Sequence, residues 1–309
     1  MFRSLPWAVL ALSPFLTTGC SLKKMTVDQT AEVLKDAAKG FNAEPNPDLA
    51  RMAGPGLLKT TEGFLQVSPD NRVLLALNAE SFCGYAFAFV EDELETIAED
   101  DPKWEPTRQL ATTLYTRCEG FGRRLLHLYD DDLFPKALDG TLEDLQKTLA
   151  KIEADKDEDA VPGLFWTALG WGSRINVNRD DISAVTTLAK VIAIMETVAK
   201  LDPRFYNGGA NLTLGLAYSA QGKAMGGNPE LGKQKLEAAI AATEGKFLMT
   251  KVMMARIWAK QVLDRASFDR LIKEVLDAPE NLWPAEQLAN AIAKRKAARY
   301  QKQAAEWFE

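Results

Sequence analysis

Few residues in this sequence have the types and the spacing that common enzyme chemistry requires. The single histidine, His127, lies in a helix-like stretch over residues 123–129 and has no Cys or His at metal-ligand spacing, so we interpret it as a helix or core residue. The sequence contains no Gly-x-Ser-x-Gly elbow, His-Glu-x-x-His helix, phosphate loop or Gly-x-Gly-x-x-Gly turn. We therefore predict no catalytic residue, no metal, no cofactor and no enzymatic activity.

Carboxylates are the other groups that could act as a general acid and a general base. They are plentiful, and seven of them form one run, which consists of Glu91, Asp92, Glu93, Glu95, Glu99, Asp100 and Asp101. Such a run at the end of a helix usually faces solvent, and we expect a solvated helix face. We expect the same of the basic residues near the C-terminus, which are Lys294, Arg295, Lys296, Arg299 and Lys302. Since the formal net charge of −6 is spread along the chain, we predict no nucleic-acid partner.

Cys20 is the one residue whose surroundings indicate a covalent modification. Arg3 is followed by an apolar stretch over residues 5–16, by small residues and then by this cysteine, which is the layout of a secretory signal. The ending resembles the lipobox of bacterial lipoproteins, in which the cysteine receives lipid and becomes the new N-terminus. We therefore expect residues 1–19 to be a lipoprotein signal peptide and Cys20 to be a membrane anchor. Thr17 stands where a large apolar residue is usual, so an ordinary cleaved signal is the alternative.

Cys83 and Cys118 are the remaining cysteines. An exported protein can form a disulfide, but a chain of this length does not need one for stability. The turn signal at residues 101–102 could make the flanking helices antiparallel. The usual helix separation of ~8–10 Å nevertheless exceeds the ~4.4–6.8 Å between Cα atoms that a disulfide requires. We therefore expect two buried free thiols, with a disulfide as the alternative.

The segments between the prolines are rich in Ala, Leu, Lys, Glu and Gln, which predicts an all-α fold. Two predicted helix pairs place small and large residues on facing sides. These residues are Trp166, Leu169, Gly170, Val191, Met195 and Val198 in the first pair, and Leu214, Gly215, Tyr218, Gly232, Leu236 and Ala239 in the second. Because such pairs bury their apolar faces only by stacking, we predict an irregular tetratricopeptide-like helix-turn-helix solenoid.

Two further features concern the ends of this predicted stack. A long C-terminal helix from Pro284 to Phe308 is expected to cap it with Trp307 and Phe308. The acidic stretch 153–159 divides an N-terminal helical half, residues 20–159, from a repeat-bearing half, residues 160–309. Because no flexible linker separates the halves, we expect one continuous domain. We also expect no second apolar run of membrane-spanning length.

Aromatic and methionine side chains, with a few polar neighbours, are the remaining candidates for a binding site. They are Phe165, Trp166, Trp171, Arg174, Tyr206, Asn207, Tyr218, Phe247, Met253, Met254 and Trp258. Large apolar side chains at helical spacing most often form core, and the functional alternative is a concave groove for an apolar ligand or a partner's segment. Arg174 and Asn207 could orient a carboxylate or carbonyl, or could equally satisfy helix ends.

Several motifs resemble the T-component family of TRAP-type transporters. They are the stretch from Leu164 to Pro203, Leu212–Tyr218, Met225–Glu230, Gly245–Leu248, Ser68–Asn71 and Gly84–Glu91. The likeness covers nearly the whole chain after the signal, in order. It implies a periplasmic lipoprotein of irregular tetratricopeptide-like helix pairs that associates with the solute-binding P-component. For some members it also implies a homotrimer with an apolar channel through each subunit.

On this model the protein is a non-enzymatic docking module that binds or relays an apolar solute, for instance an apolar acid. The alternative is a tetratricopeptide-type scaffold for envelope assembly, with no small-molecule site. We expect a location in the periplasm with a lipid anchor in a membrane. The outer membrane is slightly favoured, because Ser21 is not the acidic residue that retains some lipoproteins in the inner membrane.

Overall fold

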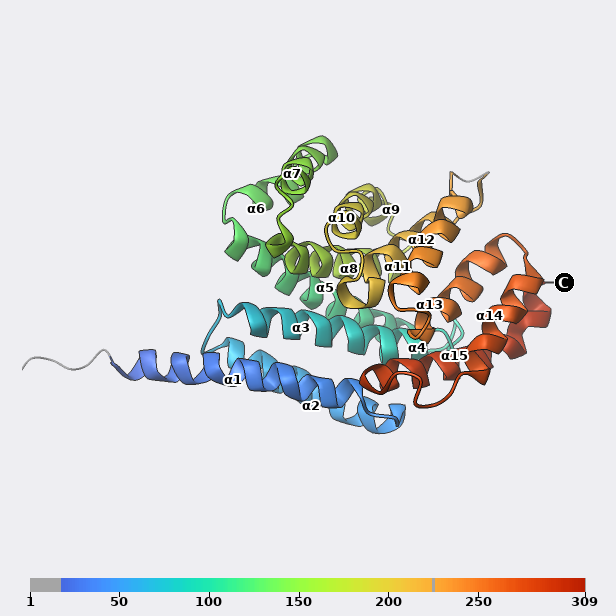
Figure 1. Ribbon diagram of the computed structural model, residues 1–309, viewed down its shortest axis with the longest axis horizontal. Helices are drawn as coiled ribbons and strands as arrows, with labels where there is room; N and C mark the ends of the chain where they lie inside the picture. The colour runs from blue at the N-terminus through green and yellow to red at the C-terminus, as the bar shows by residue number, and fades with distance from the viewer. Residues whose placement is uncertain (1–17, 224–225, 309) are drawn as a thin grey trace, which may run out of the picture.

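The computed structural model describes the backbone of residues 18–223 and 226–308, and the side chains of that range from residue 22 onward. Within it every regular element is helical and no strand is present (Figure 1). The all-α prediction is therefore confirmed for this part of the chain. The predicted signal peptide lies almost entirely outside the described residues, and so does the side chain of Cys20.

The N-terminal helices lie along the lower edge of the molecule in Figure 1. They are α1 (Thr18–Asn42), α2 (Pro47–Leu65) and α3 (Arg72–Tyr85). The side chains of Asn46 and Asn71 start α2 and α3 by accepting hydrogen bonds from free backbone N–H groups of the first turn. α3 continues into a π-helical turn, η1 (Ala86–Val90), and then into the short α4 (Glu91–Leu94). α3, η1 and α4 therefore form one continuous helical segment that leads from the apolar core to the acidic run.

The middle of the molecule is built around α5 and α8. The helices here are α5 (Trp104–Tyr129), α6 (Leu133–Asp139), α7 (Leu142–Asp155), η2 (Glu158–Ala160) and α8 (Val161–Val177). A Cβ on Gly122 of α5 would lie only 2.7 Å from the carbonyl carbon of Trp166. A Cβ on Gly170 of α8 would lie 2.8 Å from the carbonyl oxygen of Tyr115. The backbones of α5 and α8 are therefore in direct contact at these glycines, which have no side chain to keep them apart. His127, the single histidine, also lies on α5, and its side chain is exposed.

The remaining helices continue the stack to the C-terminus. They are α9 (Ile182–Val185), α10 (Leu188–Leu201), α11 (Phe205–Ser219), α12 (Pro229–Ala242), α13 (Leu248–Met253), the π-helical η4 (Met254–Ala259), α14 (Arg265–Asp277), η5 (Pro284–Glu286) and α15 (Gln287–Trp307). The predicted close approach of α11 and α12 is confirmed, because a Cβ on Gly215 would meet the side chain of Leu236. The predicted face of α10 is buried, with Val191, Met195 and Val198 at most 1 % exposed.

The C-terminal residues pack back onto α14, as the sequence predicts. The ring of Phe268 lies 5.9 Å from that of Trp307 and 5.1 Å from that of Phe308. These contacts close a second apolar cluster, which also holds Met254 and Tyr300. The end of the chain thereby covers an apolar face that would otherwise meet water.

The structure joins Cys83 and Cys118 in a disulfide with a Cα–Cα distance of 5.5 Å, so the expectation of two free thiols was wrong. That expectation compared the distance between helix axes with the distance between Cα atoms. Each Cα lies about 2.3 Å from its helix axis, so two facing Cα atoms at a crossing are closer than the axes by almost twice that amount. The bond spans a sequence separation of 35 residues. By restricting the unfolded chain, a loop of that size contributes about 4 kcal/mol to stability.

Two helical segments have the length and composition to cross a membrane, Arg72–Leu94 and Ile182–Leu201, where the sequence analysis expects none. The first comprises α3, η1 and α4, and 56 % of its most apolar window is buried inside the protein. Its apolarity is that of a core helix. The second comprises α9 and α10, and 28 % of its window is buried. Its inner face, which includes Ile194, still packs into the main apolar cluster.

Candidate functional site

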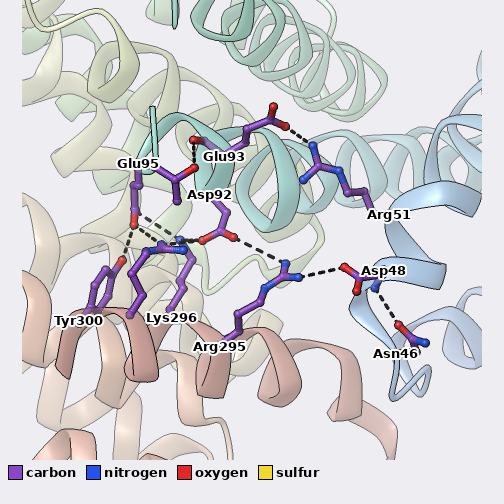
Figure 2. Close-up of polar contacts among 11 residues, drawn as sticks. Asn46, Asp48, Arg51, Asp92, Glu93, Glu95, Arg295, Lys296 and Tyr300 are labelled. Carbon is purple, nitrogen blue, oxygen red and sulfur yellow. Dashed lines mark hydrogen bonds and ion pairs between the residues drawn. The ribbon is translucent and has the colours of Figure 1, made fainter. Parts of the chain in front are cut away.

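Acidic side chains of the run 91–101 and basic side chains near the C-terminus, which were expected to face solvent, instead form ion pairs with each other (Figure 2). Lys296 on α15 is fully buried, and its Nζ lies 2.8 Å from Asp92 Oδ1 and 3.3 Å from Glu95 Oε1. Arg299 contacts the same two carboxylates at 2.7 and 2.6 Å. The Tyr300 hydroxyl donates a hydrogen bond to Glu95 at 2.6 Å. At these positions both predictions of a solvated face were therefore wrong.

This charge cluster extends to α2 on its outer side (Figure 2). Arg295 lies 3.2 Å from Asp48, and Arg51 of α2 pairs with Glu93. Burial opposes ionisation of Asp92, but the neighbouring charges of Lys296 and Arg299 outweigh it and hold the pKa of Asp92 below its ordinary value. The carboxylates are engaged by cations, so the cluster clamps α15 to α2 and α4 and is not a general acid–base pair.

A cavity of about 490 Å³ opens between α1, α3, α5 and the start of α8. Its wall is mainly apolar and includes Val73, Leu77, Leu125, Leu126, Pro162 and Gly163. Lys35, Arg72 and Asp159 are exposed where the cavity meets solvent. Glu80 and Asn42 line it further along α3 and α1. A volume of this size is typical of sites for small organic ligands, which occupy roughly 300–1,000 Å³.

A strained turn lies at the start of α11, and its Tyr206 hydroxyl would be 3.9 Å from a Cβ on Gly84, one turn of α3 beyond the cavity residue Glu80. Tyr206, Asn207 and Gly208 have φ values of 45°, 58° and 75°, so three consecutive residues are left-handed. For the two non-glycine residues this conformation costs about 1–3 kcal/mol each, and such backbones concentrate at ligand sites and switch regions. The Tyr206 ring is held by Trp166 at 4.7 Å and by Phe165 at 5.6 Å between ring centroids.

The carboxyl groups of Glu80 and Glu286 contribute to raising the pKa of the Tyr206 hydroxyl. Burial raises the pKa of Glu80, Asn42 opposes the rise, and the charge of Glu286 adds to it. Burial likewise raises the pKa of Glu286, which Asn207 contacts. Among the side chains that the structure describes, no lysine or arginine pairs with either carboxyl group.

Tyr206 itself combines exposure with an environment of low polarity. Of its surface 36 % is accessible to solvent. Burial nevertheless raises its pKa well above the ordinary value, and the negative charges of Glu80 and Glu286 add to the increase. We call Phe165, Trp166, Tyr206, Asn207 and Glu80 the inner site.

The other predicted groove residues on α8 and α11 point elsewhere. The Trp171 indole donates a hydrogen bond to Thr187 at 2.9 Å. Arg174 forms an ion pair with Glu119 at 3.0 Å, and the Tyr218 hydroxyl donates to Glu196 at 2.7 Å. These polar groups therefore bind side chains of neighbouring elements.

The predicted groove residues after position 240 belong to the second apolar cluster. They are Phe247, Met253, Met254 and Trp258. Met253, Met254 and Trp258 are 8 %, 2 % and 6 % exposed, and Lys233 lies over the Trp258 ring at 4.9 Å. Of the predicted groove residues, the structure therefore gathers only Phe165, Trp166, Tyr206 and Asn207 at the inner site. Their contact with a ligand stays a prediction.

Glu80, Asn42 and Glu286 were not among the residues predicted from the sequence. One signal for Glu80 was present, because it is the only acidic residue within the otherwise apolar stretch 73–90. An isolated charge on an apolar helix is rarely left in the core without a reason. Asn42 and Glu286 stand at helix ends, where capping is the ordinary explanation, and nothing in the sequence distinguishes them.

A family model described as TRAP transporter T-component matches residues 43–308. The chain belongs to the TRAP transporter T-component family. The match includes Glu80, Phe165, Trp166, Tyr206 and Asn207, and it begins after α1. No curated protein matches the sequence significantly.

Membership sets the coarse function of this T-component. The family is a transport accessory family, which implies a non-enzymatic role, association with other TRAP transport components and a periplasmic location. Among the described residues, no group of three or more His, Cys, Asp or Glu side chains is placed to hold a metal ion.

Proposed function

We propose that this T-component docks the solute-binding P-component of a TRAP-type transporter and relays an apolar solute through its own interior. The observation that carries the relay is the apolar cavity of about 490 Å³ that leads along α3 to Glu80, beside the strained Tyr206 turn. An apolar ligand that leaves water for this wall gains about 25 cal/mol for each Å² of apolar surface removed from water. The cavity is thus suited to hold a solute without covalent chemistry.

The strained turn is the part of the inner site that we expect to respond to the solute. Its left-handed residues are held by the aromatic contacts of Tyr206 with Phe165 and Trp166, both of which are almost fully buried. A solute that displaces the Tyr206 ring would relieve backbone strain and change the start of α11. Such a change gives the T-component a way to report occupancy to a docked partner.

We also propose a lipid anchor at Cys20 and a homotrimeric assembly. Lipid on Cys20 would hold the T-component at a membrane, with the outer membrane slightly favoured, and would raise its effective concentration near the P-component. In Figure 1, the N-terminal end of α1 extends past the neighbouring helices. We also propose that residues 20–159 and 160–309 form one tetratricopeptide-like solenoid domain that assembles as a homotrimer.

A scaffold without a small-molecule site is the second candidate. It is favoured by the exposed apolar side chains of Leu49 and Met52, which are 52 % and 79 % exposed and are neighbours on α2, three residues apart. Adjacent exposed apolar side chains can form part of a protein–protein contact. The scaffold would need no cavity, so an experiment that fills the cavity separates the two candidates.

Native mass spectrometry of the protein purified gently from its own host tests the relay. The wild-type protein should carry a bound apolar molecule. Ala76→Phe should remove it, because Ala76 lines the cavity and the larger ring fills part of its volume. Ala37→Phe on the exposed face of α1 is the matched control and should keep the molecule. A ligand-free wild-type mass, or a ligand that Ala76→Phe retains, would favour the scaffold.

A further inference from the structure

We propose that the inner end of the cavity recognises a positively charged amino group on an apolar solute, and that Glu80 is the residue that binds it. The proposal rests on the proposed function, whose solute class it names. It replaces the apolar acid considered from sequence with an apolar amine.

The cavity runs along α3 and α1. α3 contributes Arg72, Ala76 and Glu80 to its lining, at intervals of one helical turn. At a rise of 1.5 Å per residue, Glu80 lies about 12 Å along the helix from Arg72. α1 runs alongside with Lys35 near the outer end and Asn42 near the inner end. The cavity is therefore a slot with a solvent-exposed outer end and an inner end at Glu80.

The charges along that slot make its inner end acidic. Three cations line the slot, and none of them pairs with Glu80. Arg72 lies at the outer end, and Lys35 lies 3.7 Å from Glu32. Lys39, which stands between Lys35 and Asn42 on α1, lies 2.6 Å from Asp36. At the inner end Glu80 has Glu286 as its charged neighbour, and in the described part of the chain no cation pairs with either group. A ligand carboxylate placed there would meet two acidic groups.

An amine would form favourable interactions at both the carboxyl group and the apolar wall. Glu80 is half-buried, and burial together with the charge of Glu286 raises its pKa. An ammonium group would supply a positive charge and donate hydrogen bonds to the carboxylate, an interaction stronger than a neutral hydrogen bond. The apolar wall formed by Val73, Leu77 and Leu126 would bind the hydrocarbon part.

Three probes of equal chain length test the proposal: octylamine, octanol and octanoate, titrated into the exported protein by isothermal calorimetry at pH 7.5. A charge-assisted hydrogen bond is worth ~1.5–3 kcal/mol, so octylamine should bind about tenfold or more tighter than octanol. Octanoate should bind more weakly than octanol. Glu80→Gln should bring octylamine to the affinity of octanol, because the amide keeps the shape but not the charge. Glu158→Gln, an exposed change at the outer end of the same cavity, should leave the preference intact.

Any other binding result contradicts the amine proposal alone or the amine proposal together with the relay. If octanol binds but octylamine has no advantage over it, or if the advantage survives Glu80→Gln, the amine proposal is wrong while the relay stands. If octanoate binds most tightly, the solute is an acid and the proposal is wrong. If none of the three probes binds, the cavity is not a solute site, and the relay and the amine proposal both fail.

Discussion

Asp92→Ala is expected to lower the free energy of unfolding by about 3–5 kcal/mol, the loss typical of breaking a buried ion pair. Asp92 is 7 % exposed and contacts both Lys296 and Arg299. Its removal leaves the fully buried Lys296 ammonium with Glu95 alone, at 3.3 Å. Chemical denaturation at pH 7 measures the effect. Because the folded state lowers the pKa of Asp92, its contribution is present at neutral pH and is lost as the pH falls through that folded-state value.

Two variants control this experiment. Glu93→Ala removes the next carboxylate of the same run, whose pair with Arg51 is 38 % and 43 % exposed at its two side chains. An exposed pair contributes about 0–1 kcal/mol, so this variant should stay close to wild type. Asp92→Ala combined with Lys296→Met should be less unstable than the sum of the two single changes, because neither charge is then left alone. An equal, small effect of Asp92→Ala and Glu93→Ala would show that the cluster does not clamp α15.

Gly122→Ala is expected to destabilise the protein by about 3 kcal/mol, at the upper end of the usual cost of overpacking. The added methyl would press on the backbone of α8 at Trp166 and Thr167, and backbone atoms cannot move aside as a flexible side chain does. Gly120→Ala, two residues earlier on the same helix, has nothing within 4 Å of the new Cβ. It should stabilise by about 0.5–1 kcal/mol, since alanine favours a helix over glycine.

Thermal or urea unfolding of the two glycine variants measures this difference directly. The sign should differ between positions 120 and 122 although the substitution is the same. α5 and α8 also supply the cavity wall at Leu125 and Gly163, so Gly122→Ala should weaken solute binding as well as stability. Two glycine variants of equal stability would mean that the α5–α8 contact is looser than the structure has it.

Local patterns predicted the helices well, because helix formation depends on residues three and four apart. The α10 face of Val191, Met195 and Val198 and the close approach at Gly215 followed from such spacing alone. The terminal cap at Trp307 followed from its position at the end of the last helix. The same reasoning failed where partners lie far apart in sequence.

The charge cluster shows the reason for that failure. Asp92 and Lys296 are separated by about two hundred residues and form one ion pair in the fold. Each belongs to a run that is polar when considered alone, and the usual position of such a run is the surface. The disulfide between Cys83 and Cys118 was only the alternative prediction, because the spacing of helix axes was used in place of the Cα–Cα distance at the crossing of α3 and α5.

The candidate site could be predicted in part. Phe165, Trp166, Tyr206 and Asn207 were selected from their residue types, and the structure places them together. The strained turn could not be predicted, because left-handed Tyr206 and Asn207 depend on the packing around them and only Gly208 favours that conformation. The cavity depends on space left between four helices, which no local pattern records.

Binding to the P-component is the measurement that tests the account most directly. The protein would be purified from its own host after mild crosslinking, and the partners identified by mass spectrometry. Recovery of a solute-binding P-component with the wild-type protein, and its retention with Lys302→Ala as an exposed control, is the predicted result. Recovery of cell-envelope enzymes without any P-component would contradict the transport role and support the scaffold.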